Sequence, residues 1–146
     1  MSRRLALLLL AAPLMSCDFT QGSDLNQCQS TIPAPCGDTA HCVLTSDQYL
    51  QGRFPGGQTF IVRTSGPQAV TFSFVFLNRE TPGTGLTLTS TEPDCSEESS
   101  YVSQGDLFEL SGGSGVLSFP IQMNSAGDHL VTFHSDAYCS YELRYQ

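Results

Sequence analysis

The sequence contains no lysine and no tryptophan, and both absences narrow the functions open to it. Its six basic residues are all arginine and stand against fourteen acidic residues, so the formal net charge is −8. A surface of this sign repels phosphate groups, which argues against nucleic acid and against anionic lipid headgroups as electrostatic partners. The absence of tryptophan removes the ring that most often stacks on sugars, which disfavours a carbohydrate-binding module.

Familiar catalytic motifs are missing as well. The sequence has no HExxH, no phosphate-cradling glycine loop and no EF-hand loop. Ser114 lies in the segment GGSGV, which lacks the glycine spacing of a nucleophile elbow. His129 and His134 are five residues apart in one expected strand, so they lie on opposite faces and cannot together bind one metal without help from another element. We therefore expect no enzymatic activity, no catalytic residues and no cofactor.

The apolar run at the N-terminus is too short to span a bilayer. Arg3 and Arg4 precede the apolar residues 5–13, and Leu14-Met15-Ser16-Cys17 follows. A cationic start, a short apolar segment and a small residue before the cleavage point mark an export signal. These residues resemble the signal of bacterial lipoproteins. The resemblance implies that residues 1–16 are removed and that Cys17 carries acyl chains, which hold the protein stably at a membrane. The alternative is ordinary secretion after Ser16, without lipid.

Removal of Arg3 and Arg4 with the signal leaves four arginines against fourteen acidic residues, a net charge of −10. The expected location is the bacterial cell envelope, with the outer membrane favoured over the inner membrane. Asp18, directly after the cysteine, resembles the inner-membrane retention signal of enteric lipoproteins, but that rule differs between bacterial groups. The expected partners are the membrane, through the lipid, and a protein of the envelope.

Five further cysteines in so short a chain indicate an oxidising compartment and disulfide bonds; they are Cys28, Cys36, Cys42, Cys95 and Cys139. Their spacing excludes a zinc site of the usual kind. We expect Cys95 to pair with Cys139, and one bond to form among the three N-terminal cysteines. The remaining thiol would then lie in the N-terminal segment, either buried or exposed to a covalent partner.

Three regions follow from the composition: a signal peptide at residues 1–16, a lipidated cysteine and polar tether at 17–27, and one domain at 28–146. The domain begins with a cysteine-rich, turn-rich stretch at 28–47, where we expect disulfides to replace a core. From Tyr49 onward, alternating apolar and polar residues predict strands.

The predicted fold is an all-β, antiparallel sandwich of jelly-roll type, stabilised by disulfides. Val70, Phe72, Phe74 and Phe76 lie on one face of a strand and are expected to form its core side. The expected strands lie at 58–65, 70–76, 86–90, 101–110, 116–123, 128–135 and 138–145. The expected turns are Gly56-Gly57, Gly66-Pro67, Pro82-Gly83, Gly112-Gly113 and Ala126-Gly127.

Residues 58–145 resemble the prepeptidase C-terminal domains, small β-sandwich modules found in secreted bacterial peptidases. The resemblance depends on QTFIV at 58–62, the alternating strand at 70–76, AGDHLVTF at 126–133 and SYELR at 140–144. The last two segments look like the closing hairpin of that family. The chain departs from it at Gly85-Leu86-Thr87, where the family often has an acidic strand start. The resemblance implies a non-catalytic module used for binding or as a spacer.

Two weaker candidate sites remain. Loop carboxylates attract calcium, so a cluster of acidic residues is a weak calcium candidate, although solvated carboxylates are commoner; the cluster is Glu92, Asp94, Glu97 and Glu98. Tyr49, Tyr101 and Tyr138 are the only substitutes for a sugar-stacking tryptophan. The sequence thus predicts a lipid-anchored binding or structural module. The alternatives are an adhesion or motility-associated lipoprotein that engages a protein partner, a carbohydrate-binding module, and a secreted domain without lipid.

Overall fold

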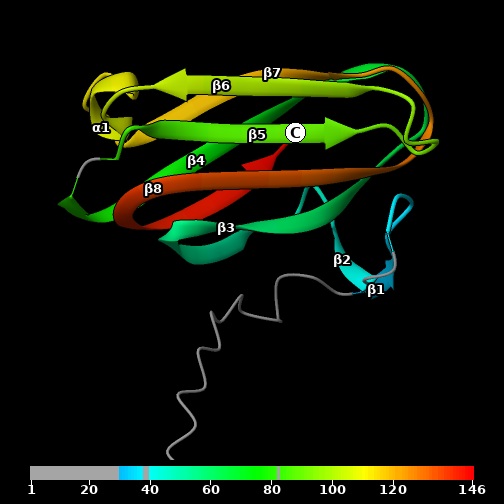
Figure 1. The fold of residues 1–146 in the computed structure, drawn as a ribbon, viewed down its shortest axis with the longest axis horizontal. Helices are drawn as coiled ribbons and strands as arrows, with labels where there is room; N and C mark the ends of the chain where they lie inside the picture. The colour runs from blue at the N-terminus through cyan, green and yellow to red at the C-terminus, as the bar shows by residue number, and fades with distance from the viewer. Residues whose placement is uncertain (1–29, 38–39, 82) are drawn as a thin grey trace, which may run out of the picture.

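The computed structural model describes residues 30–37, 40–81 and 83–146 (Figure 1). Cys17, Cys28 and the predicted signal and tether lie outside these residues. The elements of the described part are β1 Ser30–Pro33, β2 Ala40–Leu44, β3 Leu50–Thr64, β4 Gln68–Thr81, β5 Gly85–Thr91, β6 Glu98–Gln104, α1 Leu107–Leu110, β7 Val116–Met123 and β8 Gly127–Tyr145. Among them there is no helix with the length and apolar character needed to cross a membrane.

The predicted all-β sandwich is confirmed, and two long strands build it. β3 and β8 pair antiparallel along nearly their whole length. The first half of β8 pairs on its other side with β5, and the second half pairs with β4. One connected sheet therefore folds over into two layers, with β5 and β6 in one layer and β4 and β7 in the other (Figure 1). β8 is an inner strand of both layers.

Glycine and proline allow β3 to bend where it passes from one layer of the sandwich to the other. Its pairing with β8 shifts between Phe54 and Gly56, and a Cβ on Gly57 would lie 1.8 Å from the carbonyl oxygen of Phe133. The expected turn at Gly56-Gly57 is wrong, because these residues lie inside β3 at its bend. Small residues mark close backbone approach as well as chain reversal, so the sequence alone does not separate the two cases.

The expected closing hairpin is also wrong. Residues 128–135 and 138–145 form a single strand, β8, which changes partners between Ser135 and Tyr138. Other bounds differ less: β3 begins at Leu50 rather than at residue 58, and the strand expected at 101–110 ends at Gln104, before α1. The strand expected at 116–123 coincides with β7.

An aromatic cluster fills the space between the layers. The phenylalanine stripe of β4 faces inward as predicted, with all of its members buried; they are Phe72, Phe74 and Phe76, together with Val70. Phe74 lies at the centre, its ring centroid 5.2 Å from that of Phe133 and 6.0 Å from that of Tyr141. Alternation along β8 buries Cys139, Tyr141 and Leu143 on the same side. Burial of these rings is the main stabilisation of the sandwich.

The N-terminal stretch contributes strands as well as disulfides, contrary to expectation. β2 pairs in parallel with β3, with Val43 opposite Ile61, and Val43 and Leu44 are buried. The Tyr145 hydroxyl donates a hydrogen bond to the Leu44 carbonyl at 2.9 Å. This edge of the sheet therefore has its own apolar contacts.

The predicted Cys95–Cys139 disulfide is wrong, because Cys95 pairs with Cys36. Cys95 lies in the exposed β5–β6 turn, whereas Cys139 lies beyond the bend of β8 with its side chain in the core. Cys42 is disulfide-bonded too. We expected a thiol in the N-terminal segment, but Cys36 and Cys42 are both disulfide-bonded. The cysteine that the described residues show outside a disulfide is Cys139, whose side chain is buried.

Candidate functional site

The acidic residues of the β5–β6 turn do not converge on one point. Glu92 is buried, whereas Asp94, Glu97 and Glu98 are exposed. The Asp94 carboxylate accepts hydrogen bonds from the backbone and the hydroxyl of Ser96. Within residues 30–37, 40–81 and 83–146, no group of three His, Cys, Asp or Glu side chains is placed to hold a metal ion.

The Glu92 carboxylate instead joins two turns. It accepts hydrogen bonds from the backbone N–H of Asn124 at 2.8 Å and from the hydroxyl of Ser125 at 2.5 Å, both in the β7–β8 turn. Burial raises the pKa of Glu92, but these hydrogen bonds and the neighbouring His129 outweigh it and hold the pKa below its ordinary value. The ionised carboxylate therefore stabilises this end of the sandwich.

His129 belongs to the same buried network. Its Nε2 lies 3.0 Å from the Thr64 hydroxyl and 3.1 Å from the Ser125 carbonyl, and its Nδ1 lies 3.7 Å from the Glu92 carboxylate. An acid, a histidine and a hydroxyl thus lie together, as in acyl-transfer enzymes. However, the Thr64 hydroxyl donates its proton to the Ser125 carbonyl at 2.8 Å, and the His129 ring is fully buried. The network fits a structural role.

The other sequence candidates are scattered. The Ser114 hydroxyl donates to the Ser111 carbonyl within the turn before β7. The ring of Tyr49 lies under the Arg144 guanidinium, and the ring of Tyr101 packs inward against Phe119. Tyr138 is about half exposed. The three tyrosines therefore do not form one exposed platform for a sugar.

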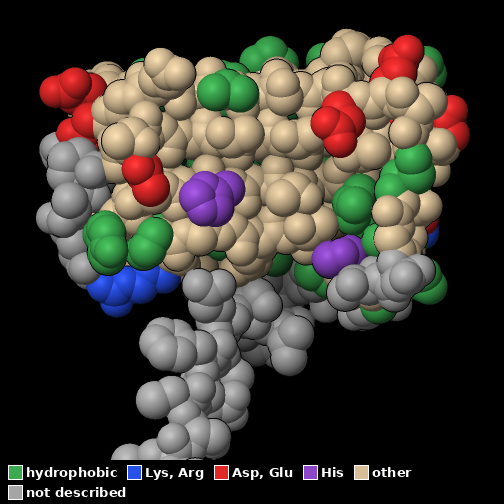
Figure 2. All heavy atoms as spheres, in the orientation of Figure 1, with side chains coloured by type: hydrophobic (Ala, Val, Ile, Leu, Met, Phe, Trp, Pro, Cys, Tyr) green, Lys and Arg blue, Asp and Glu red, His purple; other side chains and the backbone are tan. Residues whose placement is uncertain are grey.

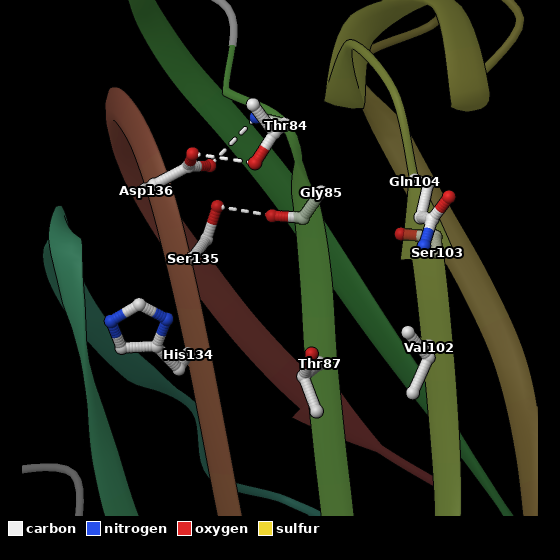
Figure 3. Close-up of a pocket in the computed structure, with 9 residues that line it drawn as sticks. All are labelled: Thr84, Gly85, Thr87, Val102, Ser103, Gln104, His134, Ser135 and Asp136. Atoms are coloured by element: carbon white, nitrogen blue, oxygen red, sulfur yellow. Dashed lines mark hydrogen bonds between the residues drawn. The ribbon is translucent and has the colours of Figure 1, made fainter.

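A hollow of about 300 Å³ lies on the outer face of β5, β6 and β8 (Figure 3). Val102 on β6, Thr87 on β5 and His134 on β8 lie opposite one another in register and form a row across the three strands. The complete lining is Thr84, Gly85, Thr87, Val102, Ser103, Gln104, His134, Ser135 and Asp136. The hollow reaches from the outer edge of β6 to the bend of β8.

Hydrogen bonds hold one wall of the hollow in place. The Asp136 carboxylate accepts from the backbone N–H of Thr84 at 2.7 Å and from its hydroxyl at 2.6 Å. The hydroxyl of Ser135 donates to the carbonyl of Gly85 at 2.7 Å. The bonds from Thr84 lower the pKa of Asp136, so this wall carries an ionised carboxylate at neutral pH. The bend of β8 is thereby fixed to the start of β5.

The chemistry of the hollow suits recognition of a polar or cationic group. It offers the Asp136 carboxylate, the exposed His134 ring, the Gln104 amide and the Thr87 hydroxyl, whereas the hydroxyls of Thr84 and Ser135 already donate within its wall. The Ser103 hydroxyl donates to the backbone carbonyl of Leu86 and accepts from the backbone N–H of the same residue. The Thr84 hydroxyl does donate to a carboxylate, that of Asp136, but this carboxylate also accepts the Thr84 backbone N–H, so the pair fastens the bend of β8 to the start of β5.

Only His134 of these lining residues stands out in the sequence. The other residues have side chains that are ordinary at exposed strand positions. The lining residues come together because β5 pairs with β6 on one side and with β8 on the other. From the sequence we expected a hairpin where β8 is a single strand, so this pairing was not predicted. Comparison with known proteins adds nothing to this picture, because neither a protein-family model nor a curated protein matches the chain.

Proposed function

We propose that the protein is an exported bacterial lipoprotein, anchored by acyl chains on Cys17, whose β-sandwich is a non-catalytic binding or structural module. The observation that carries the proposal is the order of the N-terminal residues: two arginines, a short apolar run, and Leu14-Met15-Ser16-Cys17. The Cys36–Cys95 disulfide supports export, because such bonds persist in oxidising compartments.

The hydrogen bonds already made by the reactive side chains support a non-catalytic module. Thr64 and Glu92 hydrogen-bond to the β7–β8 turn, and the Nε2 of His129 lies within hydrogen-bond distance of the Thr64 hydroxyl, all in one buried network. Asp136 in the hollow binds the start of β5. These contacts favour a rigid surface that binds a partner, as the resemblance to prepeptidase C-terminal domains implies, over a site that turns over substrate.

Intact-mass analysis of the protein from membranes tests the anchor. The expected product begins at Cys17 and carries the mass of two or three acyl chains, which is enough for stable anchoring. Cys17→Ser should give an unprocessed or released chain. A mature N-terminus at Cys17 without acyl mass would refute lipidation and favour the secreted alternative. Density fractionation then distinguishes the outer membrane, which we favour, from the inner membrane.

A protein of the envelope is the partner that the charge favours. The mature chain has four arginines against fourteen acidic residues, so a basic protein surface complements it, whereas phosphate does not. A purified chain that hydrolyses generic esters or peptides, with the activity abolished by a single Ser or His substitution, would refute the non-catalytic proposal.

A further inference from the structure

β6 is an edge strand with outward-facing backbone groups. Among the described strands it pairs only with β5. The N–H of Gly105, just past its end, donates to the Thr84 carbonyl at 2.8 Å. Hydrogen bonds in an antiparallel pair fall on alternate residues. It follows that the backbone groups of Tyr101 and Ser103 hydrogen-bond to β5. The backbone N–H and C=O groups of Ser100, Val102 and Gln104 point away from the sheet.

The neighbouring edge strand, β7, is blocked at the equivalent place. The Phe76 N–H donates to the Gly115 carbonyl at 2.7 Å, so alternation directs the backbone of Pro120 away from β4. Proline has no N–H and prevents another strand from adding at that position. β6 contains neither proline nor a basic residue, and Val102 on it is 61% exposed. One edge is thus protected and the other is open.

The surroundings of the open edge are acidic. No lysine or arginine occurs between residues 80 and 143, which include all of β5, β6 and β7. Glu97 and Glu98 lie at the start of β6, and Asp106 and Glu109 follow its end. Figure 2 shows acidic side chains on this face and no basic side chain over β5 or β6. The hollow beside the edge adds the carboxylate of Asp136.

We propose that the β6 edge binds an extended, lysine- or arginine-bearing segment of a partner protein by strand addition. Backbone hydrogen bonds to Ser100, Val102 and Gln104 would supply affinity, and the acidic surroundings would select basic side chains. A partner side chain that crosses Val102 enters the hollow. A second copy of this chain is the poorer occupant, because two acidic edges repel each other. This inference rests on the proposed binding function.

A defined peptide tests the proposal without the natural partner. Isotope-labelled residues 18–146, folded with their disulfides, are titrated with acetyl-Lys-Val-Thr-Val-Lys-Val-Thr-Val-Lys-amide and followed by NMR. We expect the backbone amide resonances of Ser100, Val102 and Gln104 to shift, and those of Ser118 on β7 to stay unchanged. The same peptide N-methylated at alternate residues keeps its charge but loses its ladder donors. It should bind about tenfold more weakly.

Variants of the protein provide the matched comparison. Val102→Pro removes an outward N–H and should weaken binding about tenfold, whereas Ser118→Pro on the edge of β7 should leave it unchanged. Ser100→Pro, at the next outward position of β6, is an independent second variant. Unchanged resonances of β3 and β8 verify that each variant is folded.

Three outcomes would overturn the inference. They are no binding, equal binding of the plain and N-methylated peptides, and concentration-dependent shifts of the β6 amides without peptide, which would instead indicate a second copy. None of these outcomes bears on the proposed lipid anchor, because the acyl mass on Cys17 is measured in a separate experiment. Failure of strand addition is therefore distinguishable from failure of the proposed function.

Discussion

The ring of Tyr101 on β6 stacks on the ring of Phe119 on β7, with the centroids 3.7 Å apart and the planes 5° from parallel. β6 and β7 share no backbone pairing within the described residues. This aromatic contact therefore joins the two edges of the sandwich and holds β6 in place.

Replacing Tyr101 with Ala should lower the free energy of unfolding by about 2–3 kcal/mol, less than for a fully buried ring because Tyr101 is partly exposed. Urea denaturation measures the change. Tyr138→Ala removes a ring of the same kind that is 49% exposed, and we expect it to cost less than about 0.5 kcal/mol. Equal losses in the two variants would contradict the role of the stack.

Gly57→Ala should be severely destabilising, by about 3 kcal/mol or more, because the new methyl group meets the Phe133 carbonyl 1.8 Å away and the backbones of β3 and β8 must separate. Gly66→Ala is the matched control, since nothing lies within 4 Å of its added Cβ. Thermal unfolding compares the two. A Gly57 variant as stable as the Gly66 variant would refute the close packing at this bend.

Glu92→Gln removes the charge that accepts hydrogen bonds from Asn124 and Ser125. A hydrogen bond to a charged group contributes about 1.5–3 kcal/mol, so we expect a loss of this size at neutral pH. The folded pKa of Glu92 lies below its ordinary value of 4.5. Its stabilisation is therefore complete above that ordinary value and is lost as the pH falls through the folded pKa.

Unfolding free energies measured from neutral to acidic pH should show the wild type losing its advantage over Glu92→Gln as the pH decreases. Glu98→Gln changes an exposed carboxylate and serves as the control. A constant difference between wild type and Glu92→Gln at every pH would show that the ionised form is not what stabilises the turns.

The Cys36–Cys95 disulfide closes a loop with a sequence separation of 59 residues. On the chain-entropy model, a loop of this length stabilises the fold by about 4 kcal/mol. Replacing both cysteines with serine should reduce the free energy of unfolding by that amount. A change below about 1 kcal/mol would indicate that the contacts of β1 and β2 alone position this segment.

The partner of Cys42 provides an independent check on lipidation. Cys36 and Cys95 pair with each other, and Cys139 is a buried thiol. If acylation occupies Cys17, Cys28 is the partner left for Cys42. Peptide mapping without reduction should therefore link Cys28 to Cys42. A link from Cys42 to Cys17 would contradict the anchor.

Alternation was a sound guide where a strand stays in one layer. The phenylalanines of β4 and the whole of β7 lie where the sequence places them, because one face of each strand is buried and the other is not. Alternation is a poor guide to strands that pass from one layer to the other. Gly56, Gly57 and residues 135–138 look like turns, yet they mark bends in β3 and β8, and long-range pairing decides between the two.

The candidate site was harder to anticipate than the fold. His134 stood out only together with His129, as one of two histidines five residues apart, whereas Thr87 and Val102, which complete its row across the sheet, come from two other strands. The disulfide was misassigned for the same reason: Cys36 reaches Cys95 because the N-terminal strands pack beside the end of the sandwich, and local spacing does not encode that contact.

The position of β8 as an inner strand of both layers also sets the order of events in making the protein. Neither layer has its centre until β8 has left the ribosome, so the strands that precede β8 have no stable sandwich to form by themselves. A chain that is to be threaded through an export channel must remain unfolded until it has crossed. If the protein is exported, as we propose, this order of the strands would delay folding in that way, and folding would then take place in the compartment where Cys36 and Cys95 are oxidised.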